Sequence, residues 1–182
     1  AGEYRQKTGH EFWMGDQYVC CDYGTQNPTA FLLWSKGADK KWYCRREYYY
    51  SGRDKGRQKT DKEFSDDLTA WLSGEKVRAV ILDPAAASFK AQLEKDGYKV
   101  KKAKNGVLDG IRFVATLLLS GSIFVDKSCE NLIKEFASYI WDAKAAERGE
   151  DKPVKEHDHA LDALRYFCYT IIRRGGGIRI LK

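Results

Sequence analysis

The chain has 182 residues, 32 basic and 26 acidic side chains and 43% hydrophobic residues, which is typical of one compact domain. Its aromatic content of 13% excludes a disordered chain, and its five cysteines, odd in number and without a CxxC pair, exclude a disulfide framework and a zinc ribbon. The longest apolar run is well below the ~20 residues that cross a bilayer, and the first residues are polar. We therefore expect neither membrane insertion nor secretion.

The net charge of +6 is concentrated in residues 36–62, which contain ten Lys or Arg and four Asp or Glu. Aromatic side chains are interleaved with these cations. Such a segment can bind a phosphate-rich polymer, because cations displace its counterions and rings rest against sugars or bases. A solvated strand edge protected by lysines has the same composition. Charge alone leaves both interpretations open.

The first half of the chain predicts an antiparallel sheet. After a polar lead-in over residues 1–16, three extended runs at 17–26, 29–36 and 41–52 are separated by short turn sequences rich in Gly, Pro, Asn and Asp. Short connections of this kind join neighbouring antiparallel strands. The simplest pairing is therefore an antiparallel meander of these three strands.

The pattern changes at Thr60, where the sequence TDKE has the form of a helix-capping box. Helices and strands then alternate up to a C-terminal helix. The expected helices are 60–73, 88–96, 107–120, 128–140 with Ser128 as cap, and 156–173; the expected strands are 77–83, 98–104 and 121–126; residues 141–155 form a hairpin arm or an irregular loop. This order predicts one α/β domain over residues 17–174, built on a mixed sheet with helices on both faces and followed by a flexible tail at 175–182.

Two carboxylates stand where predicted strands end. Asp22 follows the apolar run of the first strand, and Asp83 follows the run VIL before Pro84. An acid at such a position is costly to desolvate unless a cation compensates it, and α/β sheets place their sites at strand ends. A divalent metal would compensate both carboxylates, whereas a turn-capping role would explain each alone.

The C-terminal helix has one packing face and one polar face. His159 and Asp162 are three residues apart and share a face with Tyr166, while His157 falls on the apolar side. Asp158 and Asp162, four residues apart, repel each other unless a cation lies between them. The helix can therefore present metal ligands, although a solvated polar face is the simpler alternative.

Four stretches of this chain resemble the C-terminal nuclease domain of phage terminase large subunits, which has the RNase H-like fold. They are CDYGTQNPTAF, VILDPAAASF, NGVLDGIRFVATLLLSGSIFV and HDHALDALRY, and the resemblance covers most of residues 17–170. It implies that the acidic triad of the family falls on Asp22, Asp83 and Asp162, with His159 matching a histidine of some members. The wider fold often has Glu at the second position, where this chain has Asp83.

The resemblance implies a metal-dependent endonuclease that cuts concatemeric double-stranded viral DNA during genome packaging in the host cytoplasm. Its metal would be Mg²⁺ or Mn²⁺ in a two-metal site held by Asp22, Asp83, Asp162 and His159. A phosphate-binding loop of the form GxxxxGK[ST] is missing, so the ATPase domain, the small terminase subunit and the portal are expected partners outside this chain.

Three alternatives remain open on the sequence. A resolvase or a transposase-like nuclease would use the same acids on another DNA substrate, and a non-catalytic basic domain would bind DNA without cutting it. Asp109 could be a fourth carboxylate near the metals, but an Asp at that position more often matches the helix dipole.

Overall fold

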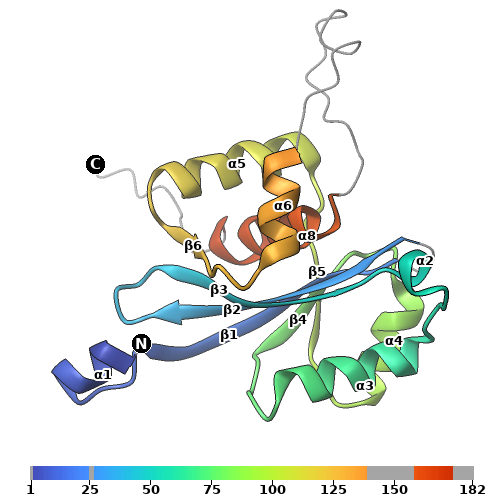
Figure 1. The fold of residues 1–182 in the computed structure, drawn as a ribbon, viewed down its shortest axis with the longest axis horizontal. Coiled ribbons are helices and arrows are strands. Elements are labelled where there is room, and N and C mark those ends of the chain that lie inside the picture. Colours follow the sequence, from blue (N-terminus) through green and yellow to red (C-terminus); the bar gives the residue numbers. More distant parts are fainter. Residues whose placement is uncertain (1, 25–26, 139–157, 174–182) are drawn as a thin grey trace, which may run out of the picture.

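The computed structural model describes residues 2–24, 27–138 and 158–173 (Figure 1). The strands are β1 (Trp13–Asp22), β2 (Thr29–Gly37), β3 (Trp42–Tyr50), β4 (Ala79–Leu82), β5 (Val100–Lys102) and β6 (Ile123–Val125). The helices are α1 (Gly2–Thr8), α2 (Gly52–Lys55), α3 (Asp61–Leu72), α4 (Ala87–Lys95), α5 (Val107–Leu119), α6 (Glu130–Ser138), α8 (His159–Phe167) and the π-helical turn η1 (Cys168–Ile172). No helix within these three ranges is long and apolar enough to cross a membrane.

The strands form one six-stranded mixed sheet in the order β5-β4-β1-β2-β3-β6. β1, β2 and β3 pair antiparallel, while β4 pairs parallel with β1, β5 with β4, and β6 with β3. Each parallel strand follows a helix along the chain, as a parallel crossover requires. The predicted meander followed by alternating helices and strands is therefore confirmed, and the class is α/β.

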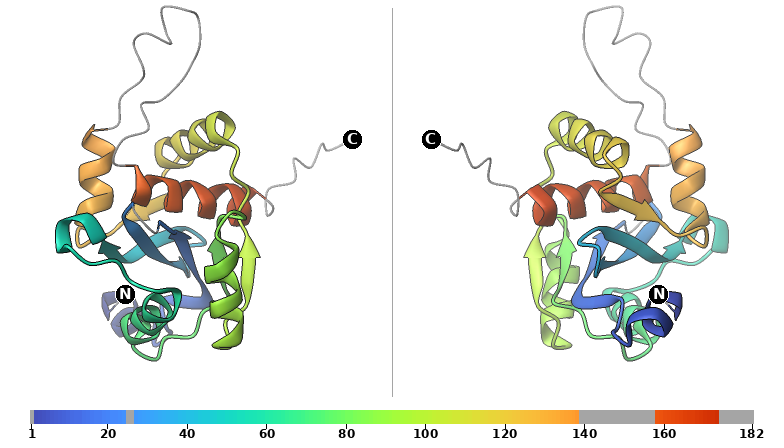
Figure 2. Two further views of the ribbon diagram at one scale, coloured as in Figure 1. Left: turned by 90° about the vertical axis from the view of Figure 1, so that its right-hand side faces the viewer. Right: turned by 90° about the vertical axis from the view of Figure 1, so that its left-hand side faces the viewer.

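Helices cover both faces of this sheet (Figures 1 and 2). The face that carries Tyr18 and Cys20 of β1 packs in one apolar cluster with α5, α6 and α8. The opposite face, with Val19 and Cys21, packs in a second cluster with α3 and α4. Alternate side chains of a strand point to opposite faces, so a strand covered on both sides is apolar throughout. The apolar run in β1 has this origin.

Helix α8 lies directly on the central strands. The ring of Phe167 stacks on that of Trp34 with centroids 4.4 Å apart, and both side chains are fully buried. Burial of two such large aromatic groups is worth several kcal/mol, since each removes about 150–250 Å² from water. This packing fixes α8 across β1, β2 and β4. The polar side chains at the start of α8 are held at one end of the sheet as a result.

The first strand begins earlier than residue 17, the predicted start. β1 begins at Trp13 and contains an irregularity between Trp13 and Gln17, where Gly15 has a φ of +73°. The Trp13 ring lies edge-on to the ring of Tyr43 on β3 at 5.5 Å between centroids. A bulge interrupts the alternation of side chains, which is why the sequence pattern there predicts only a polar lead-in.

Helix α6 is not capped by Ser128, contrary to the prediction. The Ser128 hydroxyl donates to Asp126 Oδ1 at 2.7 Å in the preceding turn. The backbone N–H groups of Asn131 and Leu132 instead donate to the carboxylate of Glu47 on β3, at 2.9 and 2.7 Å. An acid from a neighbouring strand thus satisfies the exposed donors of this helix start.

Four further predictions fall on residues that the structure does not describe. The C-terminal helix is described from His159, so the expected start at residue 156 and the position of His157 lie outside the described residues. The hairpin arm or loop at 141–155 and the tail at 175–182 lie outside them as well.

Candidate active site

Asp22 and Asp83 stand side by side at one end of the sheet. Asp22 is the last residue of β1, and Asp83 directly follows β4. The two strands are parallel neighbours with Cys21 opposite Leu82, so each aspartate is the next residue on its strand. Neighbouring strands are about 4.8 Å apart, which places the backbones of the two aspartates side by side. Asp83 also accepts a hydrogen bond from the backbone N–H of Ala85 at 2.8 Å.

Helix α8 brings the other two predicted site residues to the same end. The Nδ1 atom of His159 lies 2.9 Å from Oδ2 of Asp22, and both side chains are about one-sixth exposed. Asp162 follows one helical turn later, and its backbone N–H donates to the Asp158 carbonyl at 2.7 Å. The strand ends and the helix start therefore contribute polar groups to one locus.

Burial and like charge both act on Asp22. Burial raises the pKa of its carboxyl, the hydrogen bond to His159 lowers it, and the charges of Asp162 and Asp158 raise it again; the net direction is upward. Burial opposes a charged imidazole at His159, but the Asp22 hydrogen bond and the charges of Asp22, Glu135 and Asp158 raise its pKa above the ordinary value. The locus carries excess negative charge that favours a cation.

The phenol of Tyr166 lies within electrostatic range of the whole acidic group. Burial raises the pKa of Tyr166, and the charges of Asp22, Asp162 and Asp83 raise it further. The side chain is 5% exposed. One buried ring on α8 thus interacts with all three predicted acids, which lie on β1, after β4 and on α8.

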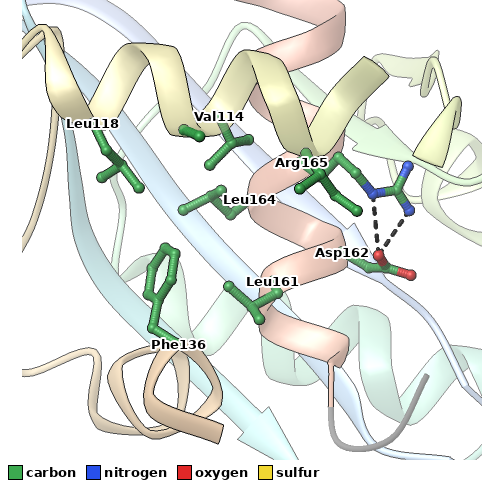
Figure 3. A pocket seen from close by; sticks show the side chains of 9 residues that line it. Val114, Leu118, Phe136, Leu161, Asp162, Leu164 and Arg165 are labelled. Atoms are coloured by element: carbon green, nitrogen blue, oxygen red, sulfur yellow. Dashed lines mark hydrogen bonds and ion pairs between the residues drawn. The ribbon is translucent and has the colours of Figure 1, made fainter. Parts of the chain in front are cut away.

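Asp162 is paired with the arginine one turn further along α8. Nη2 and Nε of Arg165 donate to its Oδ1 at 2.7 and 3.1 Å (Figure 3). The pair lies at the rim of a cavity of about 130 Å³ between α5, α6 and α8, lined otherwise by apolar side chains such as Val114, Leu118 and Phe136. This cavity adjoins the acidic locus but lacks its chemistry.

The acidic locus fits a hard divalent cation by its donor chemistry. Three carboxylates and one imidazole supply the oxygen and nitrogen ligands that Mg²⁺ and Mn²⁺ accept. Burial and, to a smaller extent, the charges of Asp162 and Asp158 raise the pKa of Asp22, and a bound cation would oppose both effects. Within residues 2–24, 27–138 and 158–173, no three His, Cys, Asp or Glu side chains are close enough to ligate one ion as they stand. The imidazole of His159 contacts Asp22, and the guanidinium of Arg165 forms an ion pair with Asp162.

A family profile described as "Terminase RNaseH-like domain" matches residues 21–169, which include all four predicted site residues. The chain belongs to this terminase RNase H-like family. The resemblance predicted from the four sequence motifs is confirmed, and the mixed α/β sheet is the RNase H-like fold of that family.

Comparison with individual proteins also finds large terminases. The structure of a large terminase from a thermophilic bacteriophage is 51% identical, with a TM-score of 0.85, and covers 90% of this chain. The large terminase subunit of Escherichia phage T5 is 32% identical over 157 residues, 84% of this chain. The nuclease domain of the bacteriophage SPP1 large terminase, solved with bound Mn, is 19% identical with a TM-score of 0.61. The match covers 88% of this chain and 87% of that domain, and at this identity it supports the fold alone.

The chain spans only part of these larger relatives. It matches 34% of the T5 subunit and 41% of the large terminase from the thermophilic phage. The terminase family assignment therefore applies to one domain of such proteins.

The sequence did not decide whether Asp109 and Asp158 belong to the metal site, and the structure places them differently. Asp109 is exposed in the first turn of α5, where its carboxylate accepts a hydrogen bond from the Tyr169 hydroxyl at 3.4 Å. Asp158 is buried at the start of α8, and its charge acts on Asp22 and His159. The charge of Asp158 therefore acts on the acidic locus, while Asp109 fits the dipole-matched role.

Sequence reasoning missed Glu135, which links α6 to the helix of the site. Its Oε2 accepts the backbone N–H of Leu161 at 2.9 Å, so the glutamate satisfies a donor at the start of α8. The side chain is 5% exposed, and burial raises its pKa to about 7 although the Leu161 hydrogen bond, Tyr49 and His159 all oppose this. No local motif marks it, because its partner is 26 residues away.

Glu135→Gln is expected to stabilise the metal-free protein above pH 8 and to leave its stability at pH 4 unchanged. The folded-state pKa of about 7 exceeds the ordinary value of 4.5, so stability from the protonated group is present below pH 4.5 and is lost as the pH rises through 7. Gln keeps an acceptor for Leu161 and carries no charge, which gives a gain on the order of 2 kcal/mol. Calorimetry at both pH values measures it.

The matched control is Glu130→Gln, an exposed acid in the first turn of the same helix. It should give no gain at either pH. Equal shifts for Glu135→Gln at pH 4 and pH 8.5 would contradict the assigned burial effect.

The basic segment 36–62 is divided between the two ends of the sheet. Gly37 pairs with Trp13 at the start of β1, so the turn after β2 lies far from Asp22. Thr29 pairs with Tyr50, and Asp22 with Ala30, so α2 lies at the acidic end. Five of the ten cations pair with carboxylates on α3, just after it or at the C-cap of α4. The pairs are Arg45 and Arg46 with Glu75, Arg57 with Glu63, Lys59 with Asp67, and Lys62 with Asp66 and Asp96.

Proposed function

We propose that this domain is a divalent-metal-dependent endonuclease that cuts double-stranded DNA. The observation that carries the proposal is the convergence of Asp22, Asp83 and the start of α8 at one end of the sheet. Membership of the terminase RNase H-like family supports it, because the SPP1 relative is named as a nuclease domain.

The proposed cofactor is Mg²⁺ or Mn²⁺, held as a pair of ions. Asp22, Asp83 and Asp162 are the proposed carboxylate ligands, and His159 is the proposed nitrogen ligand. The bound ions would lower the pKa of an attacking water and neutralise charge on the scissile phosphate. The SPP1 domain was solved with bound Mn, which supports a divalent ion here.

The protein side chains have separate tasks in this proposal. Asp22 and Asp83 come from rigid strand ends, so their carboxylates are held in fixed relative positions. The Nδ1 atom of His159 contacts Asp22, which orients the imidazole. Tyr166 is buried and within electrostatic range of all three acids, and apolar surroundings of this kind strengthen charge interactions.

Plasmid cleavage with and without metal tests the function. Purified protein should nick and linearise supercoiled DNA in Mg²⁺ or Mn²⁺ and should leave it intact in EDTA. Binding without cutting in both ions would favour the non-catalytic DNA-binding alternative. Strong preference for a four-way junction over linear duplex would favour a resolvase.

The proposed biological substrate is concatemeric viral DNA during genome packaging. The similarity to large terminases supports this setting, and the matched share of 34–41% implies that the complete relatives contain other domains. We propose that an ATPase domain, a small terminase subunit and the portal are the partners, and that the protein acts in the cytoplasm of the infected host.

The cations of α2 should contribute more to DNA binding than the cations in the turn after β2. Arg53 and Lys55 are exposed at the acidic end, so replacing both by Ser should lower affinity about tenfold and reduce the salt slope by about two. Fluorescence anisotropy of a labelled duplex in EDTA, over a range of NaCl, measures both quantities without cleavage.

The control is Lys40→Asn with Lys41→Ser at the opposite end of the sheet. Asn tolerates the φ of +66° at residue 40. This variant should keep wild-type affinity and salt slope. If it weakens binding as much as the α2 variant, the DNA does not lie across the acidic end.

A further inference from the structure

Arg165 is a buried cation in contact with one of the proposed metal ligands. It lies on α8 one turn after Asp162 and is 4% exposed. Nε and Nη2 donate to Asp162 Oδ1 at 3.1 and 2.7 Å. Figure 3 shows the guanidinium turned toward this carboxylate. Arginine stays protonated at all accessible pH values, so the guanidinium is a constant positive charge beside this carboxylate.

The same guanidinium also binds the segment before α5. Nη1 donates to the backbone carbonyls of Asn105 and Gly106 at 2.8 and 3.2 Å. The Asn105 side-chain amide, in turn, donates a hydrogen bond to Asp83 Oδ2 at 3.4 Å. One residue of α8 thus connects Asp162 with the loop that contacts Asp83.

The surroundings of Arg165 are shaped for its side chain. A Cβ added at Gly110 of α5 would lie 2.7 Å from Cγ of Arg165 and 2.8 Å from its Cδ, closer than packing allows. The stem also lines the apolar cavity with Leu161 and Leu164. In this low-dielectric setting a planar fork that binds several oxygens at once is worth more than a point charge. Lysine cannot reproduce it.

We propose that Arg165 is the positioning residue of the metal site, which fixes the Asp162 carboxylate relative to Asp83 through the 105–106 segment. This inference rests on the proposed metal-dependent function. Partners that orient a ligand in this way typically change metal affinity or activity by about 10–100-fold when they are replaced.

The test compares Mn²⁺ binding by the intact chain in three variants, with calorimetry as the readout. Arg165→Lys keeps the charge and loses the fork, so Mn²⁺ should bind about 10–100-fold more weakly, and excess Mn²⁺ should restore much of the cleavage rate. Gly110→Ala keeps Arg165 but displaces its stem, and should weaken binding in the same direction. It also tests the proposal if Arg165→Lys fails to fold.

Arg173→Lys is the matched control, since Arg173 lies at the end of η1 with its guanidinium over the Tyr169 ring. It should bind Mn²⁺ as the wild type does. The proposal is overturned if Arg165→Lys and Gly110→Ala both bind Mn²⁺ with wild-type affinity, even at a lowered melting temperature. Arg165 would then contribute only to packing. If the wild-type chain itself bound no Mn²⁺ and cut no DNA, the proposed function would fail first.

Discussion

Asn at Asp22, Asp83 or Asp162 is expected to reduce DNA cleavage in Mg²⁺ by about a thousandfold or more. A carboxylate ligand supplies both a donor atom and the negative charge that retains a divalent ion, and Asn supplies only a neutral oxygen. A thousandfold loss corresponds to about 4 kcal/mol of transition-state stabilisation, within the range of metal-ion catalysis. Initial rates of plasmid linearisation under single-turnover conditions measure the effect.

The same substitutions should leave the fold intact. In EDTA the Asp22→Asn protein should melt at the wild-type temperature or higher, because burial and neighbouring acids already disfavour the charged carboxylate. Asp109→Asn is the matched control, an exposed acid in the first turn of α5 that should keep the wild-type rate. Wild-type cleavage by any one of the three site variants would remove that residue from the proposed site.

The sequence predicted the sheet because its signals are local. Alternating or continuous apolar runs mark the strands, and the capping box at Thr60 and Glu63 is present as expected. Two of the site predictions also had local origins: an acid after an apolar run for Asp22 and Asp83, and an i, i+3 spacing for His159 and Asp162. The parallel pairing of β1 with β4 then brings the first two together.

The features that the sequence missed depend on distant pairs of residues. Glu47 caps α6 from a strand 84 residues away, and Glu135 binds the start of α8 across 26 residues. Arg165 contacts carbonyl groups 60 and 59 residues away. Only its spacing of three from Asp162 was a local signal that could have indicated the ion pair. Tertiary packing decides contacts of this kind, and no propensity records them.

The charge of residues 36–62 shows a second limit of sequence reasoning. A net excess of six left a single phosphate-binding surface open on the sequence. In the structure, β3 runs the length of the sheet and separates the turn after β2 from α2 at opposite ends. Arg45 and Arg46 moreover share one carboxylate, Glu75, which offsets one of their two charges. Composition counts charges, whereas the fold decides which of them share a face.

His159→Ala is expected to weaken divalent-ion binding about 10–100-fold while leaving much of the cleavage rate recoverable at high Mn²⁺. A ligating histidine commonly binds metal through one ring nitrogen while the other contacts a carboxylate, and here Nδ1 contacts Asp22 at 2.9 Å. One neutral ligand replaces none of the carboxylate charge, so the loss should be smaller than that of Asp22→Asn. Cleavage rates over a range of Mn²⁺ concentrations separate affinity from the limiting rate.

Two further outcomes of the His159→Ala experiment have distinct meanings. If the loss persists at saturating Mn²⁺ and the acidic limb of the pH–rate profile changes, His159 moves a proton instead of binding metal. Wild-type rates at every metal concentration and pH would show that His159 is a structural residue at the start of α8.

The free energy of unfolding in EDTA gives a second measurement on the same variant. Because the pKa of His159 is raised, its contribution to stability is present below pH 6.5 and is lost as the pH rises through the folded-state value. The alanine variant should therefore be destabilised more at pH 6 than at pH 8.5, because only the protonated imidazole forms an ion pair with Asp22.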